Sequence, residues 1–254
     1  MNVIQDTMTL TGRMMKHMTR SADTIITVVV MPIMIMLAFV YILGGAMTIS
    51  VASYKGFILP AILLMTVMSG VAYTAFRLNN DVTTGIFERF HSMPIAKSAI
   101  LNSHVVTSML FNLLSVSLVL FSGVLIGFRP KADIGEWLLA LGLLVLVTLA
   151  MSWIAVFFGL IAKSNETASV FSYLLMGLLF ISSGFVPTET LPHALQGFAD
   201  YQPITPIING LRSLMSAGKV PDDLWTAFAW SIGSIVVFQW LSVFVYRKKT
   251  KLTA

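Results

Sequence analysis

The sequence has no cysteine and little charge: none of its 254 residues is Cys, and only 11% are Asp, Glu, Lys or Arg. The absence of cysteine excludes disulfides, thiolate metal sites and cysteine nucleophiles. A soluble domain carries about 25% charged residues. Because this chain has less than half that share, we expect lipid rather than water to surround most of it.

Several chemical motifs are missing as well. The chain has neither a G-x-x-x-x-G-K-[ST] loop nor a G-x-G-x-x-G loop, the two glycine-rich motifs that cradle nucleotide phosphates. The basic residues behind the net charge of +5 lie at the ends of apolar runs, which does not indicate nucleic-acid binding. The four histidines are scattered along the chain, which indicates packing rather than metal binding or catalysis. These histidines are His17, His91, His104 and His193. The sequence therefore predicts no catalytic residue, no metal site and no cofactor bound by this chain.

Apolar residues make up 57% of the sequence, and the mean hydropathy is +0.86. A helix needs about 20 apolar residues to cross a bilayer core about 30 Å thick. Six runs qualify, and helices are expected because lipid offers no partner for an unpaired backbone group. The runs are 24–43, 56–76, 100–126, 137–161, 169–185 and 224–246. The prediction is an all-α polytopic membrane protein with six transmembrane helices over 24–246, an N-terminal segment 1–23 and a basic tail 247–254.

The first run begins too late, and is too long, for a cleavable signal, so we expect it to be retained. Lys and Arg favour an orientation with both termini in the cytoplasm, because cytoplasmic loops carry an excess of these residues. In that orientation eleven of the sixteen lie inside. The five outside are Lys55, Arg129, Lys131, Arg212 and Lys219.

The N-terminal segment carries two stripes at helical spacing. Three basic residues form one stripe, and three apolar residues form the other. The stripes are Arg13, Lys16 and Arg20, and Leu10, Met14 and Met18. This pattern favours a helix in the inner membrane interface, with its apolar stripe in the acyl chains and its basic stripe toward anionic lipid. The alternative is a disordered basic tail.

The segment 77–98 also shows helical periodicity. Apolar residues recur every three or four positions, while polar residues recur on another face. The apolar set is Leu78, Val82, Ile86, Phe90 and Met93, and the polar set is Arg77, Asp81, Thr84, Glu88 and His91. We expect one amphipathic cytoplasmic helix that Pro94 ends. It either binds a protein partner or is a solvated surface helix.

The segment 184–221 is too apolar for a solvated loop, and its prolines break it too often for a seventh span. Short half-helices that re-enter the outer leaflet fit both facts, provided that protein buries the turns. A compact external cap is the alternative.

One polar stripe lies within the apolar runs. His104, Ser108, Asn112 and Ser115 recur at spacings of four, four and three in the third run. They either join helices by hydrogen bonds or line a pathway. The runs otherwise carry almost no ionisable groups and show no internal repeat, which argues against an ion-coupled carrier.

Several motifs occur in order along nearly the whole chain. The first span reads Met31-Pro32 and then Phe39-Val40-Tyr41-Ile42-Leu43-Gly44-Gly45, and the second begins Tyr54-Lys55-Gly56-Phe57-Ile58-Leu59-Pro60. The loop motif is Gly85-Ile86-Phe87-Glu88-Arg89-Phe90-His91-Ser92-Met93-Pro94-Ile95. The outer motif comprises Ser183-Gly184-Phe185-Val186-Pro187, Leu191-Pro192, Gln202-Pro203-Ile204-Thr205-Pro206 and Leu211-Arg212. Together these motifs resemble the membrane subunit of type-2 ABC transporters, in the branch of daunorubicin-resistance and multidrug efflux permeases. The sequence departs from that branch at Ala61, where Gly is common, and at His91, where a second basic residue is usual.

The resemblance implies roles for these segments. Residues 2–20 would be an interfacial elbow helix, 77–94 would contain a coupling helix that seats in a separate ATPase subunit, and 184–201 would form re-entrant hairpins. The residues implied for coupling are Asp81, Gly85, Glu88, Arg89, His91 and Pro94, and those in the re-entrant region are Gly184, Pro187, Pro192 and Pro203. The implied assembly has two copies of this chain, or this chain and a homologous permease, with two ATPase subunits that bind ATP and Mg.

The resulting expectation is a permease of the bacterial plasma membrane that exports a drug-like or lipid-like amphipathic molecule. The alternative is a membrane sensor or regulatory subunit with the same fold and no flux. A membrane-embedded enzyme is disfavoured because the sequence contains no reactive cluster.

Overall fold

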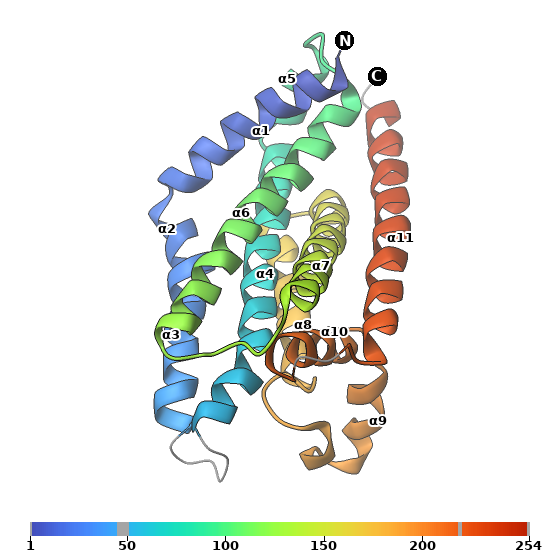
Figure 1. Ribbon diagram of the computed structural model, residues 1–254. Coiled ribbons are helices and arrows are strands. Elements are labelled where there is room, and N and C mark those ends of the chain that lie inside the picture. The colour runs from blue at the N-terminus through green and yellow to red at the C-terminus, as the bar shows by residue number, and fades with distance from the viewer. Residues whose placement is uncertain (1, 45–50, 218–219, 253–254) are drawn as a thin grey trace.

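The computed structural model describes residues 2–44, 51–217 and 220–252, and over these ranges the chain forms helices and turns without a strand (Figure 1). Gly45, Lys219 and the last two residues of the predicted tail lie outside the described residues. The α-helices are α1 (Val3–Arg20), α2 (Ala22–Ile25), α3 (Met31–Ala38), α4 (Val51–Thr83), α5 (Ile86–His91), α6 (Lys97–Leu125), α7 (Ile134–Ile161), α8 (Asn165–Phe180), α9 (His193–Tyr201), α10 (Ile204–Arg212) and α11 (Asp223–Leu252). Short π-helical turns are η1 (Ile26–Val30), η2 (Phe39–Leu43) and η4 (Ser213–Ala217), and η3 (Thr188–Thr190) is a 3₁₀ turn.

The first predicted span is a continuous helical rod made of α2, η1, α3 and η2. Pro32 lies at the start of α3, directly after the π turn η1, in which Met31 N–H donates to the Ile26 carbonyl five residues back. Proline lacks the N–H that an α-helix would need at this point. The rod therefore passes Pro32 without ending.

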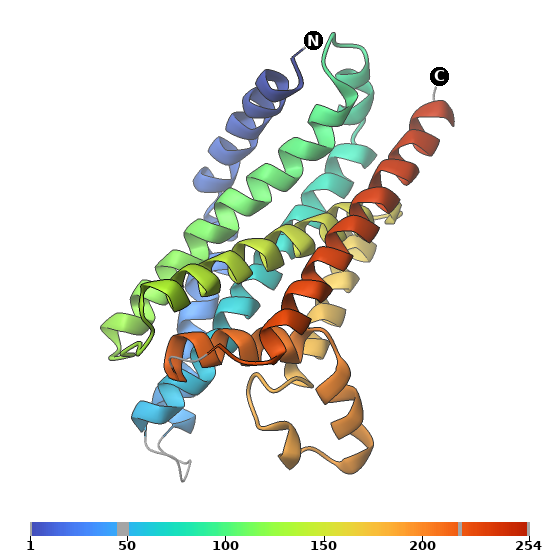
Figure 2. The same cartoon turned by 45° about the vertical axis from the view of Figure 1, so that its right-hand side comes forward.

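Within the described residues, five helical stretches are long and apolar enough to cross a membrane. They are Ala22–Ile42, Tyr54–Thr83, Lys97–Leu125, Ile134–Ile161 and Asp223–Lys249. The predicted fifth span, 169–185, corresponds to α8, which begins earlier, ends at Phe180 and has only 16 residues. Both described chain ends nevertheless lie at the same end of the bundle, next to α5, with α9 at the opposite end (Figures 1 and 2). We call these the α5 end and the α9 end.

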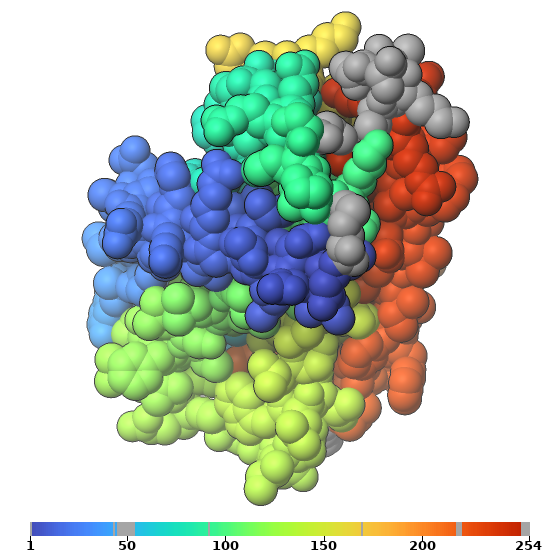
Figure 3. Space-filling view, turned by 90° about the horizontal axis from the view of Figure 1, so that it is seen from above, coloured from blue at the N-terminus to red at the C-terminus, as the bar shows by residue number. Residues whose placement is uncertain are grey.

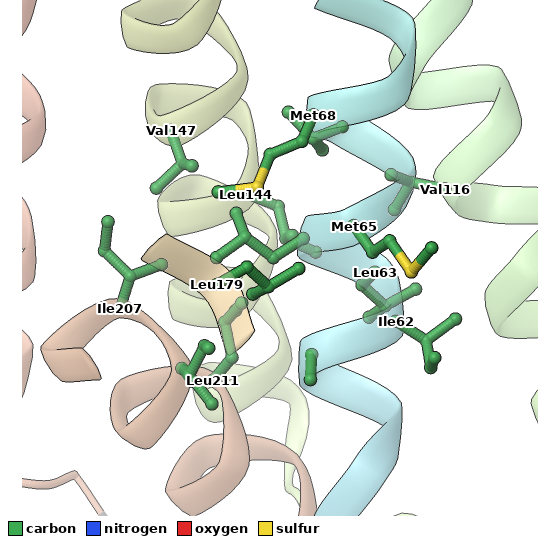
Figure 4. Close-up of a cluster of buried hydrophobic side chains, with 14 of the residues drawn as sticks. Ile62, Leu63, Met65, Met68, Val116, Leu144, Val147, Leu179, Ile207 and Leu211 are labelled. Carbon is green, nitrogen blue, oxygen red and sulfur yellow. The ribbon is translucent and has the colours of Figure 1, made fainter. Parts of the chain in front are cut away.

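The centre of the bundle is α4, which packs against α6, α7 and α8. In the apolar stretch of α4 that could span a membrane, 78% of the residues are buried. In the corresponding stretch of α11, which packs mainly on α7, only 11% are buried. Apolar side chains of α4 pack together with those of four other helices (Figure 4). They include Ile62, Leu63, Met65 and Met68 of α4, Val116 of α6, Leu144 and Val147 of α7, Leu179 of α8, and Ile207 and Leu211 of α10.

Two sequence predictions about the α5 end are wrong in detail. Residues 77–83 are not part of a separate amphipathic helix, because α4 continues through them and ends at Thr83. The apolar stripe of α1 does not lie in acyl chains: Leu10, Met14 and Met18 are buried, and α1 packs along α6. Helical periodicity located the apolar side of α1 but not that protein covers it, and in 77–93 it included Met93, which is exposed, and omitted Phe87, which is buried.

At the α9 end, the segment after α8 forms the short helices that its prolines predicted. Pro187, Pro192 and Pro203 each directly precede a helix, namely η3, α9 and α10. Helix α9 lies outside the bundle, whereas seven of the nine residues of α10 are buried against α4, α7 and α11. The segment thus combines an exposed hairpin with a helix inserted into the end of the bundle.

Candidate functional site

A sharp turn at Gly85 separates α4 from α5. Gly85 has φ 75° and ψ 8°, in the left-handed region that side chains with a Cβ rarely adopt. The turn redirects the chain, so that α5 begins at Ile86 as a separate helix. The predicted coupling residue Gly85 therefore has a definite geometric role.

Helix α5 is held by two phenylalanines. Phe87 and Phe90 are buried, with the ring of Phe87 6.0 Å from that of Tyr246 on α11 and Arg13 Cζ of α1 5.5 Å above the ring of Phe90. The neighbouring side chains Glu88 and Arg89 are exposed, as is Pro94 in the following turn, and His91 ends the helix. The two buried phenylalanines thus anchor α5, while its charged side chains are exposed at the α5 end.

Asp81 is apart from these exposed residues. Its side chain is buried and points into the bundle, where Oδ2 lies 3.5 Å from His104 Nε2 on α6. The structure thereby joins a residue of the predicted coupling set to one of the predicted polar stripe.

A further polar contact at this end involves Asn79. Its Nδ2 donates to the carbonyls of Gly159 and Ala162, at 3.1 and 2.7 Å, which satisfies carbonyls at the C-terminus of α7. No local sequence pattern indicated this contact, because the partners are 80 and 83 residues apart.

The polar stripe of α6 lies inside the bundle, between α4 and α7. His104, Ser108, Asn112 and Ser115 are at most 2% exposed. Ser152 of α7 donates to Ser108 Oγ at 2.9 Å, and Asn112 Nδ2 donates to the Ser108 carbonyl at 2.9 Å. Asn112 also lies where a Cβ on Gly70 of α4 would be, so this glycine permits the close approach of α4 and α6. In this conformation the stripe joins three helices, and a role in a pathway remains a prediction.

Arg212 ties together the elements of the α9 end. Its guanidinium donates to the carbonyls of Phe57 at 3.2 Å, Ser183 at 2.7 Å and Gly184 at 3.3 Å, and Cζ lies 3.9 Å above the ring of Phe57. Burial lowers the pKa of Arg212 to about 10, so the group keeps its charge at neutral pH. One side chain thus links α10, the start of α4 and the turn after α8. Gly184 is part of this cluster; Pro187, Pro192 and Pro203 are not, and serve instead to start helices.

Comparison with known proteins matches residues 5–216 to the family model described as ABC-2 type transporter. The chain belongs to the ABC-2 type transporter family. It is 30% identical over 226 residues to the daunorubicin resistance ABC transporter permease protein DrrB1 of Streptomyces coeruleorubidus, covering 89% of this chain and 80% of the relative. It is 23% identical over 235 residues to the probable doxorubicin resistance ABC transporter permease protein DrrC of Mycobacterium tuberculosis, covering 92% of this chain and 85% of the relative.

This family membership confirms the resemblance found in the sequence and makes the chain the membrane-spanning permease subunit of an ABC exporter. ABC-2 permeases work with ABC ATPase partners. At the α5 end of this permease, α5 exposes charged side chains and is anchored by two buried phenylalanines. At the α9 end, Arg212 connects α10 to the start of α4 and to the turn after α8. The sequence missed two contacts that organise these ends, the Asp81–His104 pair and the Arg212 cluster, because in each the partners come from different helices.

Proposed function

We propose that this permease exports a drug-like or lipid-like amphipathic molecule across the bacterial plasma membrane, driven by a separate ATPase that docks on α5. The observation that carries the proposal is the arrangement of α5, in which Phe87 and Phe90 are buried while Glu88 and Arg89 are exposed. Because these buried side chains anchor α5, a movement of the bound partner can be transmitted through α5 to α4 and α11. The drug-resistance names of the two relatives support an amphipathic substrate.

The proposed topology has six spans, with α8 as the short fifth span and both termini in the cytoplasm. Two facts support it: both described chain ends lie at the α5 end, which requires an even number of crossings, and the charge bias favours that end as the inner side. In this topology α1 is the interfacial elbow helix, the residues 247–254 form a basic cytoplasmic tail, and the hairpin with η3 and α9 re-enters the outer leaflet.

The proposed working unit is two permease subunits, identical or homologous, with two ATPase subunits that bind ATP and Mg. Closure of the ATPases would move α5 and change the access of the substrate path, for which the α6 stripe from His104 to Ser115 is a candidate lining.

Charge reversal on α5 tests the docking. We expect Glu88→Lys and Arg89→Glu to reduce co-purification of the ATPase and to abolish ATP-dependent movement of a labelled amphipathic cation in proteoliposomes, because each reverses a charge facing the partner. The matched control is Glu189→Lys, an exposed charge reversal at the α9 end, which should change neither. If both α5 variants assemble and transport as the wild type does, α5 is not the docking element.

The same assay distinguishes the alternative function. A complex that hydrolyses ATP in response to candidate compounds but moves none of them would favour a sensor or regulatory subunit.

A further inference from the structure

A wide, open groove of about 860 Å³ runs along the exposed side of α1. We call it the α1 groove; its lining includes Gly12, Arg13, Lys16, His17, Arg20 and Ser21. Neither the docking of an ATPase on α5 nor the α6 stripe makes use of it. Figure 3 shows α1 at the surface of the α5 end, between the segment around α5 and α6.

The groove concentrates positive charge. Arg13, Lys16 and Arg20 are exposed on one side of α1, at spacings of three and four residues. Across the part of the chain that the structure describes, none of these three forms an ion pair with a carboxylate. Asp6, on the same helix, is occupied elsewhere, because its Oδ2 accepts a hydrogen bond from Ala96 N–H at 3.0 Å. The groove therefore favours an anion.

His17 adds a directed donor. Its Nδ1 lies 2.9 Å from Nη1 of Arg77 on α4. A guanidinium can only donate, so Nδ1 accepts and the ring proton resides on Nε2. The exposed imidazole therefore presents an N–H group beside the three basic side chains.

The surroundings of the groove indicate what kind of anion fits. At Ser21 the chain turns directly into the first span, whose surface exposes Ile25, Ile26 and Val30. A molecule with an anionic head and apolar tails matches both the groove and this apolar surface, whereas an acidic protein surface matches only the charges. Arginine pairs bidentately with phosphate oxygens, and two arginines frame the groove.

We propose that the α1 groove binds the phosphate headgroup of an anionic phospholipid, whose acyl chains lie along the exposed surface of the first span. Because Arg13 also lies over the ring of Phe90, the bound headgroup is adjacent to α5. This site is independent of which molecule the permease transports.

Native mass spectrometry of the full-length permease, with phosphatidylglycerol or phosphatidylcholine added at equal concentration, tests the proposal. We expect the wild type to retain phosphatidylglycerol preferentially. The variant R13Q/K16Q/R20Q should bind it about tenfold or more weakly, since each basic group near an anionic lipid contributes to affinity. The matched control K163Q/R247Q/K248Q removes three exposed charges elsewhere and should bind as the wild type does.

A second variant, R13K/R20K, keeps the charge and the helical propensity of α1 but loses the bidentate geometry. We expect it to bind phosphatidylglycerol more weakly than the wild type and more tightly than the triple glutamine variant. Equal losses in the glutamine variant and its control, or wild-type binding by R13K/R20K, would mean that diffuse charge holds the lipid and would overturn the proposal. Unchanged lipid binding with lost ATPase co-purification in K16Q/R20Q, which keeps the contact between Arg13 and Phe90, would instead identify the groove as a protein contact.

Discussion

At the scale of residues, the contact between Asp81 and His104 connects α4 and α6 near the turn that leads to α5. The two side chains come from α4 and α6, are buried, and lie 3.5 Å apart. Asp81 belongs to the stretch of α4 just before Gly85, so the pair lies close to the turn that carries α5. We infer that the pair positions α5 relative to α6.

A double-mutant cycle tests this coupling. We expect Asp81→Ala to destabilise the permease by about 1–3 kcal/mol, because it removes the carboxylate that lies 3.5 Å from Nε2 of the buried His104 imidazole. The double variant with His104→Ala should show a coupling energy of about 0.5–3 kcal/mol. Denaturant unfolding in mixed micelles, followed by tryptophan fluorescence, measures both values.

The control cycle combines Asp81→Ala with Ser115→Ala. Ser115 lies eleven positions beyond His104 on the same helix, and its hydroxyl donates to the carbonyl of Phe111. Additive free energies are expected for this second pair, and additive energies for Asp81 and His104 too would show that their contact carries no coupling.

At the scale of elements, the predictability of each helix depended on what covers its apolar side. Long apolar runs predicted both ends of α6 and α7 and the start of α11 within three residues, because lipid and protein both select the same composition. The end of α11 lies six residues beyond the predicted end of the last span at 246. The N-terminus of α8 was missed by four residues, although Ser164 caps it and Glu166 lies in its first turn, a recognisable start signal. The periodicity across 77–93 continued through Gly85 and concealed the break, since the backbone angle of a glycine leaves no trace in a hydrophobic pattern.

Periodicity predicted the exposure of only some of the proposed coupling residues. It placed Asp81 and Glu88 on one polar face, but Glu88 is exposed on α5 whereas Asp81 is buried. The coupling role itself was implied by the family resemblance and stays a prediction. Asp81–His104 and the Arg212 cluster depend on contacts between helices that lie far apart in the sequence, which no local pattern encodes.

We expect the stability of the α9 end to depend on Arg212, because its side chain connects three elements. Arg212→Lys keeps the charge but cannot reproduce the fork that reaches the carbonyls of Phe57, Ser183 and Gly184. We expect a loss of about 2–4 kcal/mol in stability, because charged hydrogen bonds to buried carbonyls are strong. Limited proteolysis should cut the segment 181–192 faster than in the wild type.

Arg129→Lys is the control for this element, because Arg129 is an exposed arginine at the same end of the bundle. It should leave the proteolysis rate unchanged. Cleavage of Arg212→Lys at the wild-type rate would show that apolar packing of α10, rather than the guanidinium, holds the segment.

At the scale of the whole molecule, the number of crossings depends on α8. It has only 16 residues, and it runs toward the α9 end from a start beside α4, where Asn165 Nδ2 donates to Asn80 Oδ1 at 3.4 Å. Its neighbours α4 and α7 are long spans, so burial against them can replace the apolar length that α8 lacks. Six crossings follow if α8 spans the bilayer, and five if it does not.

The absence of cysteine makes this question directly testable. Single cysteines at Glu166, just inside the start of α8, and at Thr190, in the turn beyond its end, introduce thiols at exposed positions. In intact cells a membrane-impermeant maleimide should label T190C and not E166C, and inside-out vesicles should show the reverse, because the two sites lie at opposite ends of a crossing helix. S92C, in the exposed turn after α5, should follow E166C. Labelling of E166C and T190C from the same side would mean that α8 does not cross, and the two chain ends could then not share the cytoplasm.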